Sequence, residues 1–455
     1  MASNLLYLAL IGGLFFFAGR QRAIELVSGD QHLLNSLPGH YGFYAAAWAL
    51  VPSVLIVFLW AALGPFWVES IIHAEVLRDH PGLDPQQLAL RVSNIINCVQ
   101  LPNDEGGILA AEIDHFLNRQ AVYEGTVVVS TVAVAILAGL NGVRLIKPDM
   151  RARNSMDKLV HNVLLIASVA AILITVGIIL SLIFETIRFF TLVPIAEFLF
   201  GLEWSPQIAL RADQVASAGA FGAVPLFAGT LLITFIAMCI AVPIGLLSAI
   251  YLTQYADERF RAVAKPLLEI LAGIPTVVYG FVAALVLAPA VREMGLTLGL
   301  DVASESALAA GLIMGIMIIP FMSSLSDDAL TAVPQAMKEG SFALGATKAE
   351  TIARVLIPAA LPGIISSFLL AVSRAIGETM IVVMAAGLAA NLTANPLQAV
   401  TTVTVQIVTL LTGDQEFDSA KTLAAFALGL ALFLVTLMIN MIAQRIVKSY
   451  REQYE

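Results

Sequence analysis

Residues 327–387 read DDALTAVPQAMKEGSFALGATKAETIARVLIPAALPGIISSFLLAVSRAIGETMIVVMAAG. The first part of this stretch, up to Gly363, is too polar to cross a bilayer, and the second part is too apolar to lie in water. The apolar part nevertheless contains two charged residues, Arg374 and Glu378. We therefore expect one segment that faces a cytoplasmic partner, followed by a segment that carries charge into the membrane.

The polar part predicts two short helices joined by a glycine turn. Most residues of Ala336–Leu344 are good helix formers, and Gly345 then supplies a stop or a sharp turn. Thr347 and Glu350 have the spacing of a capping box for a second helix, which we expect to end before Pro358. On shape alone, an ordinary amphipathic loop between two membrane spans fits this pattern equally well.

The spacing inside this loop carries a resemblance. Its key residues are Glu339, Gly340, Ser341, Gly345, and the run Val355-Leu356-Ile357-Pro358. This arrangement resembles the EAA loop of ABC-importer permeases, which reads Glu-Ala-Ala, three residues, Gly, nine residues, Ile-x-Leu-Pro. The chain departs from that pattern at Gly340 and Ser341, and conservatively at Val355 and Ile357. In that family the loop docks onto the ATP-hydrolysing subunit, so the resemblance implies coupling roles for Glu339, Gly340, Ser341, Gly345, Ala346, Thr347 and Pro358.

The apolar part carries a second, narrower resemblance. The segment SRAIGETM at residues 373–380 resembles the corresponding segment of PstC-like permeases, the membrane subunits of phosphate-specific transport systems. The segments AVPIGLLSAIYLTQYA at 241–256 and EILAGIPTVVYGFVAALVLAP at 269–289 are also similar to that family. This resemblance runs from about Leu159 to the C-terminus and leaves the first third of the chain outside it. It implies an all-α, MetI-like core of six membrane helices.

Arg374 and Glu378 are the charged residues that we expect to matter most. They stand four residues apart, so on one continuous helix they would share a face and could pair. A charge at mid-membrane costs on the order of 2.5–3.5 kcal/mol, so such residues usually face a bundle interior or an aqueous path. One interpretation is a structural ion pair. The resemblance favours another, in which Arg374 attracts the phosphate oxyanion and Glu378, with Thr379 beside it, positions the anion. Glu269 and Tyr279 could belong to the path or be structural.

Composition and charge agree with a membrane protein. Apolar residues make up 59% of the chain and charged residues only 13%, well below the roughly 25% that is usual for soluble domains. The net charge of −9 does not favour nucleic acid as a partner. No phosphate-binding loop of the type GxxxxGK[ST] occurs in the sequence, so we do not expect the chain to hydrolyse ATP, to be an enzyme or to hold a metal or cofactor.

The hydrophobic runs predict about nine membrane-spanning helices. We expect them at Asn4–Ala18, Gly42–Leu63, Val122–Ile146, Leu159–Phe184, Pro225–Leu252, Glu269–Pro289, Leu308–Leu325, Gly363–Ala390 and Thr422–Ala443. Three belong to an N-terminal extension, residues 1–158, with an external segment at 64–120, and six to a permease core, residues 159–455, with the coupling loop at 326–362. Segments 185–224 and 391–421 are expected outside the membrane. Placing the basic clusters inside predicts an external N-terminus and a cytoplasmic C-terminus.

Together the resemblances imply the permease subunit of an ATP-driven phosphate importer in a bacterial inner membrane, working by alternating access. The implied partners are a PstA-like sister permease, a PstB-like ATPase dimer that holds ATP and magnesium, a periplasmic PstS-like phosphate-binding protein, and the lipid bilayer. Two alternatives stay open. One is a permease for another oxyanion, such as molybdate or sulfate. The other is an ion-gradient-driven transporter, which would need no coupling loop.

Overall fold

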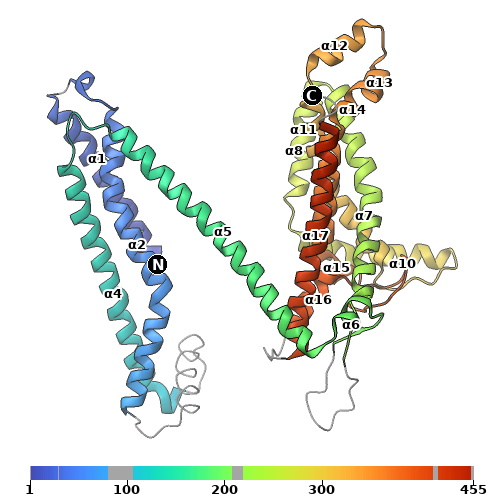
Figure 1. Cartoon of the computed structure of the whole chain (residues 1–455), viewed down its shortest axis with the longest axis horizontal. Coiled ribbons are helices and arrows are strands. Elements are labelled where there is room, and N and C mark those ends of the chain that lie inside the picture. Colours follow the sequence, from blue (N-terminus) through green and yellow to red (C-terminus); the bar gives the residue numbers. More distant parts are fainter. Residues whose placement is uncertain (1, 29, 80–105, 207–218, 413–418, 452–455) are drawn as a thin grey trace. The chain divides into compact units, whose positions relative to one another are not determined.

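The computed structural model describes residues 2–28, 30–79, 106–206, 219–412 and 419–451. These residues divide into two units, Met1–Ile172 and Leu173–Glu455, each of which is described by itself. The predicted all-α fold is confirmed: helices dominate both units, and the described strands are only β1 (Trp204–Ser205) and β2 (Ala220–Phe221), an antiparallel pair (Figure 1).

The first unit is a bundle of long helices. It contains α1 (Ala2–Leu26), a short 3₁₀ turn at Gln31–Leu33, α2 (Pro38–Asp79), α4 (Gly106–Arg144) and the first part of α5 (Ala152–Leu192). Small residues let α1 and α2 approach closely, because a Cβ on Gly19 would lie 2.8 Å from the Tyr41 carbonyl oxygen and one on Gly42 2.6 Å from that of Phe16. Such contacts are typical of helix pairs in membranes. The Tyr41 hydroxyl also donates to the Met150 carbonyl at 2.7 Å, which ties the α4–α5 loop to α2.

Eight helices of the described residues are long and apolar enough to cross a membrane. They are Pro38–Gly64, Gln120–Arg144, Ala152–Leu192, Val224–Tyr255, Thr276–Thr297, Ala307–Thr331, Lys348–Ile376 and Ala420–Ile446. The expected ninth span lies in α1, whose apolar run is closed by Arg20 and Arg22 and which is not among these eight helices. A span in α1 therefore stays a prediction, although the helix packs against α2 through its glycines.

The second unit is built on the crossing of α7 and α11. After α6 (Ile195–Phe200) and the two strands come α7 (Val224–Ile250), a π turn η2 (Tyr251–Tyr255), α8 (Glu258–Ala272), α9 (Thr276–Val282), a π turn η3 (Ala283–Leu287), α10 (Ala288–Thr297), α11 (Ala307–Thr331), α12 (Gln335–Ala343), α13 (Lys348–Thr351), a π turn η4 (Ile352–Leu356), α14 (Ile357–Ile376), α15 (Met380–Ala385), α16 (Val403–Leu411) and α17 (Ala420–Arg451). In this unit α12, α13 and the C-terminal end of α17 lie at one end, and α6 lies at the other (Figure 1).

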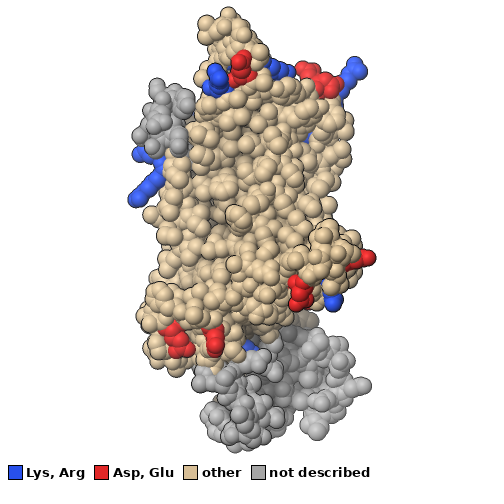
Figure 2. Space-filling model, turned by 90° about the vertical axis from the view of Figure 1, so that its right-hand side faces the viewer, with Lys and Arg blue, Asp and Glu red and all other residues tan. Residues whose placement is uncertain are grey.

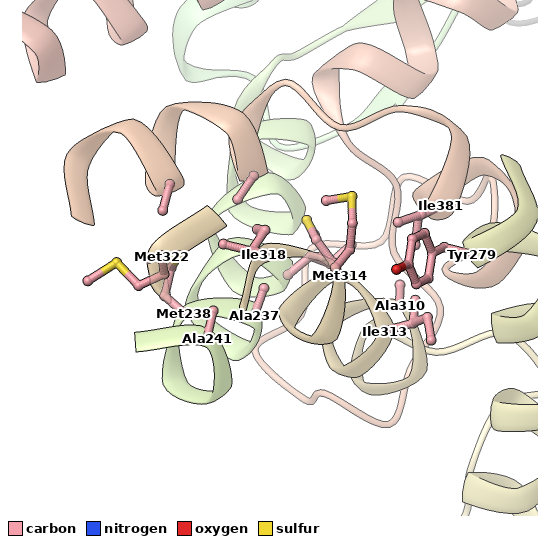
Figure 3. Close-up of a cluster of buried hydrophobic side chains, with 14 of the residues drawn as sticks. Ala237, Met238, Ala241, Tyr279, Ala310, Ile313, Met314, Ile318, Met322 and Ile381 are labelled. Atoms are coloured by element: carbon pink, nitrogen blue, oxygen red, sulfur yellow. The ribbon is translucent and has the colours of Figure 1, made fainter. Parts of the chain in front are cut away.

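Alanines and flexible methionines fill the centre of the second unit. Figure 3 shows side chains of α7 facing those of α11, with one residue of α9 and one of α15 at the edge of the cluster: Ala237, Met238, Ala241, Ala310, Ile313, Met314, Ile318, Met322, Tyr279 and Ile381. Glycines bring the two main helices together, since a Cβ on Gly315 would lie 2.9 Å from the Ala237 carbonyl oxygen. Unbranched methionine adapts to the gaps that such a close crossing leaves.

The surface of the second unit is divided by charge. On the face shown in Figure 2, charged side chains gather toward the two ends, and the broad band between them shows almost no Lys, Arg, Asp or Glu. The helices of this unit also expose large hydrophobic residues, as expected for a surface that contacts lipid or other membrane helices, for example Leu231, Phe235, Leu247, Leu285 and Leu434.

Two predicted spans are interrupted, which corrects their boundaries. The run Glu269–Pro289 is split because α8 ends at Ala272 and α9 begins at Thr276, after Pro275. Proline lacks an N–H and disfavours helical backbone in the residue before it. Glu269 therefore lies in the last turn of α8 and not at the start of a span. The run Gly363–Ala390 is likewise split, because α14 ends at Ile376 and α15 begins at Met380.

Two of the three segments expected outside the membrane, 185–224 and 391–421, contain helices. Helix α5 continues to Leu192 within the first of them. In the second, α16 packs into the interior, with Val403 and Val405 fully buried. The apolar face of α16 is short, and its burial depends on helices distant in the sequence.

Candidate functional site

The glycine turn of the coupling loop forms as predicted. Gly345 has φ +84°, a left-handed conformation that glycine adopts without steric strain. The Ala346 N–H donates to the Ser341 carbonyl at 3.2 Å and the Gly345 N–H donates to the Phe342 carbonyl at 2.9 Å. These two bonds are the Schellman motif that ends a helix, here α12.

The predicted capping box is also confirmed. The Glu350 N–H donates to the Thr347 hydroxyl at 3.3 Å, and the Thr347 N–H donates to the Glu350 carboxylate at 2.9 Å. The expectation that this helix ends before Pro358 is wrong. Helix α13 continues through η4 into α14, where Pro358 lies in the first turn. A proline needs no N–H there, and the wider π turn before it gives its ring space.

Two side-chain contacts hold the coupling loop in shape, one within the loop and one to the π turn η2 behind it. The hydroxyls of Ser341 and Thr351 share a hydrogen bond of 2.9 Å, which joins α12 to α13. The Lys348 ammonium lies 4.7 Å from the centre of the Tyr255 ring on η2, a cation–π distance. On its outer side the loop exposes Met337, Phe342 and, with 90% of its surface accessible, Leu344. The loop thus presents apolar side chains on its outer side and contacts η2 on its inner side.

The ion pair between Arg374 and Glu378, one of the two interpretations of these residues, does not form in the structure. Helix α14 ends at Ile376, so the two residues do not lie on one helix. The Glu378 carboxylate instead accepts the backbone N–H groups of Met380 at 3.1 Å and Ile381 at 3.4 Å, and so caps α15. The Arg374 guanidinium lies 5.6 Å from the centre of the Phe321 ring. In the part of the chain that the structure describes, no carboxylate forms an ion pair with it.

The break between α14 and α15 is therefore a stretch of non-helical backbone that directly follows the helical turn carrying Arg374. Arg374 is exposed, while Glu378 and Thr379 are half-buried. The Thr379 hydroxyl lies 3.4 Å from the Gly377 carbonyl oxygen, to which it donates. An exposed arginine in the last turn of a membrane helix can offer its planar donor group to an oxyanion.

A buried polar network holds this break in place. The Thr404 hydroxyl donates to the Glu378 carbonyl at 3.0 Å, and the Gln406 amide donates to the Leu388 carbonyl at 3.1 Å. The Gln406 side-chain oxygen accepts the indole N–H of Trp204 at 3.0 Å, although the two residues are 202 positions apart. Sequence reasoning missed this network because it lies in the segment expected to be external. The only signal was the run TTVTVQ at 401–406.

The other two candidate residues lie on either side of the α8–α9 break. Tyr279 is buried, and its hydroxyl donates to the Leu271 carbonyl at 2.9 Å, which closes the gap in backbone hydrogen bonding. Glu269 is exposed on α8. This geometry gives Tyr279 a structural contact. Among the described residues, no group of His, Cys, Asp or Glu could hold a metal ion.

Comparison with known proteins gives matches over most of the chain. A family described as "Binding-protein-dependent transport system inner membrane component" matches residues 241–452. A second, described as "Phosphate ATP-binding cassette transporter", matches residues 5–174. The first third of the chain, which lay outside the sequence resemblance, thus has a family match of its own.

Curated relatives agree with these families. The chain is 34% identical to the probable ABC transporter permease protein YqgH of Bacillus subtilis, covering 55% of this chain and 78% of that protein. It is 34% identical to the phosphate transport system permease protein PstC of Mesorhizobium japonicum, covering 49% and 72% respectively. A solved bacterial alginate ABC transporter gives 17% identity and a TM-score of 0.46 over 65% of this chain and 98% of that one. A TM-score below 0.5 does not support an assignment, so the family of this chain is assigned from its sequence relatives.

The helical core and its structured loop define a permease of the ABC-importer class, a multi-pass membrane protein and a transport subunit rather than an enzyme. The chain belongs to the PstC family of these permeases.

Proposed function

We propose that this chain is the membrane-spanning permease subunit of an ATP-driven importer of inorganic phosphate. The coupling loop is the observation that carries the proposal, because it presents exposed apolar residues and contacts Tyr255 of η2 behind it through Lys348. An ion-gradient-driven transporter would need no such loop. Phosphate is preferred over other oxyanions because several relatives are named as phosphate transport system permeases.

The partners follow from the loop. A PstB-like ATPase dimer, which holds ATP and magnesium, docks on Met337, Phe342 and Leu344. The residues Glu339, Gly340, Ser341, Gly345, Ala346, Thr347 and Pro358 shape the loop and its attachment. A PstA-like sister permease completes the translocation path, and a periplasmic PstS-like protein delivers phosphate. In this proposal, coupled movement of the loop alternates access to the path.

Arg374 is the group that we place on the substrate path. It is exposed, and its guanidinium can donate two parallel hydrogen bonds to a tetrahedral oxyanion. Thr379 lies at the following break and offers a hydroxyl. Glu378 contributes indirectly, because its carboxylate is engaged by the amides of α15 and fixes the shape of the break.

The proposed setting is a bacterial inner membrane with the N-terminus outside and the C-terminus in the cytoplasm. Basic residues follow α7, namely Arg259, Arg261 and Lys265, and the last two contact Asp327 at the start of the coupling loop. Basic residues favour the cytoplasmic side of a membrane. An ATPase could reach the loop only from that side.

Uptake by the reconstituted complex tests the function. Proteoliposomes should contain this chain with its sister permease and ATPase, and should receive the phosphate-loaded binding protein. We expect accumulation of labelled phosphate that requires ATP hydrolysis and that excess sulfate or molybdate does not reduce. Uptake that persists with a hydrolysis-deficient ATPase would indicate a gradient-driven transporter, and preferential uptake of sulfate or molybdate would indicate a different oxyanion permease.

We propose an accessory role for residues 1–158, either stabilising the complex in the bilayer or contacting the binding protein. A cut at residue 151 removes the first unit up to the start of α5, which begins at Ala152. We expect the truncated protein to insert, to assemble and to import phosphate at about half of the full-length rate or more. Assembly without any import, even with saturating binding protein, would overturn the accessory role.

A further inference from the structure

A charge cluster joins α8 to the last part of α11, at the start of the coupling loop. Asp327 of α11 is buried, with 2% of its surface accessible. Its two carboxylate oxygens accept from the Arg261 guanidinium at 3.1 and 3.0 Å, and one of them accepts from the Lys265 ammonium at 2.7 Å. Lys265 also lies 3.5 Å from Asp328, which is exposed. The carboxylate is thus held by two cations from one neighbouring helix.

In this cluster one buried carboxylate is balanced by two cations of α8. The hydrogen bond that the Lys265 ammonium donates to the Asp327 carboxylate raises the pKa of Lys265, which favours the charged ammonium. A buried carboxylate without its cations would be left uncompensated in a medium of low dielectric constant. Sliding α8 along α11 would therefore separate charges, and the two helices are expected to move together at this point.

On one side the cluster connects to the ATPase-facing loop. Asp327 lies in the last part of α11, which ends at Thr331, and α12 begins at Gln335. Any displacement of α12 by a docked partner acts first on this end of α11.

On the other side the cluster connects to the substrate break. Helix α8 is joined to α9 across Gly273–Pro275, and the Tyr279 hydroxyl bonds the Leu271 carbonyl across that gap. Helix α9 then touches α15, because a Cβ on Gly280 would lie 3.1 Å from the Met380 carbonyl oxygen and 2.9 Å from the Met384 sulfur. The N-terminal amides of α15 hold Glu378. A continuous series of contacts therefore runs from α12 to the break at 377–379.

We propose that Asp327, Arg261 and Lys265 are positioning residues that transmit movement of the coupling loop to the break between α14 and α15. This proposal rests on the proposed function for the identity of the partner that moves the loop. The cluster itself touches no substrate. Its role is to make α8 follow α11, so that α9 and α15 move with the loop.

Asp327→Asn tests the linkage, because it keeps the shape of the side chain and removes the charge that holds both cations. The matched control is Asp328→Asn on the next residue. Asp328 is exposed, and its distance of 3.5 Å from Lys265 is longer than the 2.7 Å of Asp327. Both changes are made in a Cys98→Ser, Cys239→Ser background that carries Thr379→Cys as a probe. The complex with its ATPase is labelled with a maleimide, with and without trapping by ATP and vanadate.

We expect trapping to change the labelling rate of Thr379→Cys at least fivefold in the background protein and in Asp328→Asn. In Asp327→Asn the change should fall below twofold while the ATPase stays bound. A purely structural cluster would lower the yield of complex without altering this dependence on nucleotide. Full nucleotide dependence in Asp327→Asn, or none in the background protein, would overturn the proposal. If Asp327→Asn does not assemble, Lys265→Gln takes its place as the test variant. It leaves Arg261 on the carboxylate, so trapping should change the labelling rate of Thr379→Cys by an intermediate factor.

Labelling needs no phosphate, so its outcome is independent of whether the importer carries that anion. A second measurement, with the natural cysteines, compares ATP hydrolysed with phosphate imported. We expect this ratio to rise at least tenfold in Asp327→Asn and to stay unchanged in Asp328→Asn. A parallel fall of hydrolysis and import would contradict the linkage, whereas absence of import by the unaltered complex would contradict the proposed function alone.

Discussion

Exchanging the two charges, Arg374→Glu together with Glu378→Arg, is expected to abolish phosphate import without rescuing either single reversal. An ion pair would be restored by the exchange, but these side chains are engaged elsewhere. Arginine at position 378 would leave the amides of Met380 and Ile381 without their acceptor and place a cation at the positive end of α15. Glutamate at position 374 would place a carboxylate where we expect the anion, and the repulsion is strong in a passage of low dielectric constant.

The milder variant Arg374→Gln separates the role in import from assembly. Loss of a charged hydrogen-bond donor to an oxyanion is worth up to about 3 kcal/mol, or about 100-fold in rate. We expect import to fall by about that factor while the complex keeps its ATPase. The measurement is initial uptake of labelled phosphate, normalised to the amount of assembled complex.

The chain contains a matched control for the exchange. Arg153 and Asp157 form an exposed ion pair with the same four-residue spacing, at 3.9 Å on the first turns of α5. Exchanging that pair should leave import unchanged, because exposed pairs contribute little. Import near the wild-type rate by the exchanged Arg374/Glu378 protein would remove Arg374 from the proposed substrate path.

Gly345→Val is expected to uncouple ATP hydrolysis from transport. The φ of +84° at this position costs a residue with a side chain roughly 1–2 kcal/mol, and a β-branched residue more. Space is not the obstacle, because a Cβ here would meet nothing within 4 Å. The strain would instead open the Schellman turn and displace Leu344 and Ser341 from their positions. We expect import to fall at least tenfold while the protein still inserts.

Two further variants show whether φ is the cause. Gly345→Asn should retain most of the import, because asparagine tolerates the left-handed region. Gly340→Ala should be tolerated, since Gly340 lies within α12, has open space around it and would gain up to about 1 kcal/mol in helix propensity. Phosphate uptake and stimulated ATP hydrolysis are measured in each. Full uptake by normal amounts of Gly345→Val would contradict the proposed role of the turn.

Local chemistry let the sequence determine the coupling loop in detail. A left-handed glycine after a helix and a threonine with a glutamate three residues later act through neighbouring backbone groups, so Gly345, Thr347 and Glu350 needed no tertiary information. The apolar runs likewise determined most of the spans, because length and hydropathy alone decide whether a helix can cross a bilayer.

Only the tertiary structure decided where the helices break and what the charged residues contact. A largely apolar run does not reveal that Gly377 ends α14, because most residues on both sides of the break are apolar. The capping role of Glu378, the contact of Arg374 with Phe321 and the bond between Trp204 and Gln406 all follow from that break or from segments far apart in the chain. The ion pairs of Arg261 and Lys265 with Asp327 also depend on the tertiary structure. The partners are 66 and 62 positions apart, and only the packing of α8 on α11 brings their charges together.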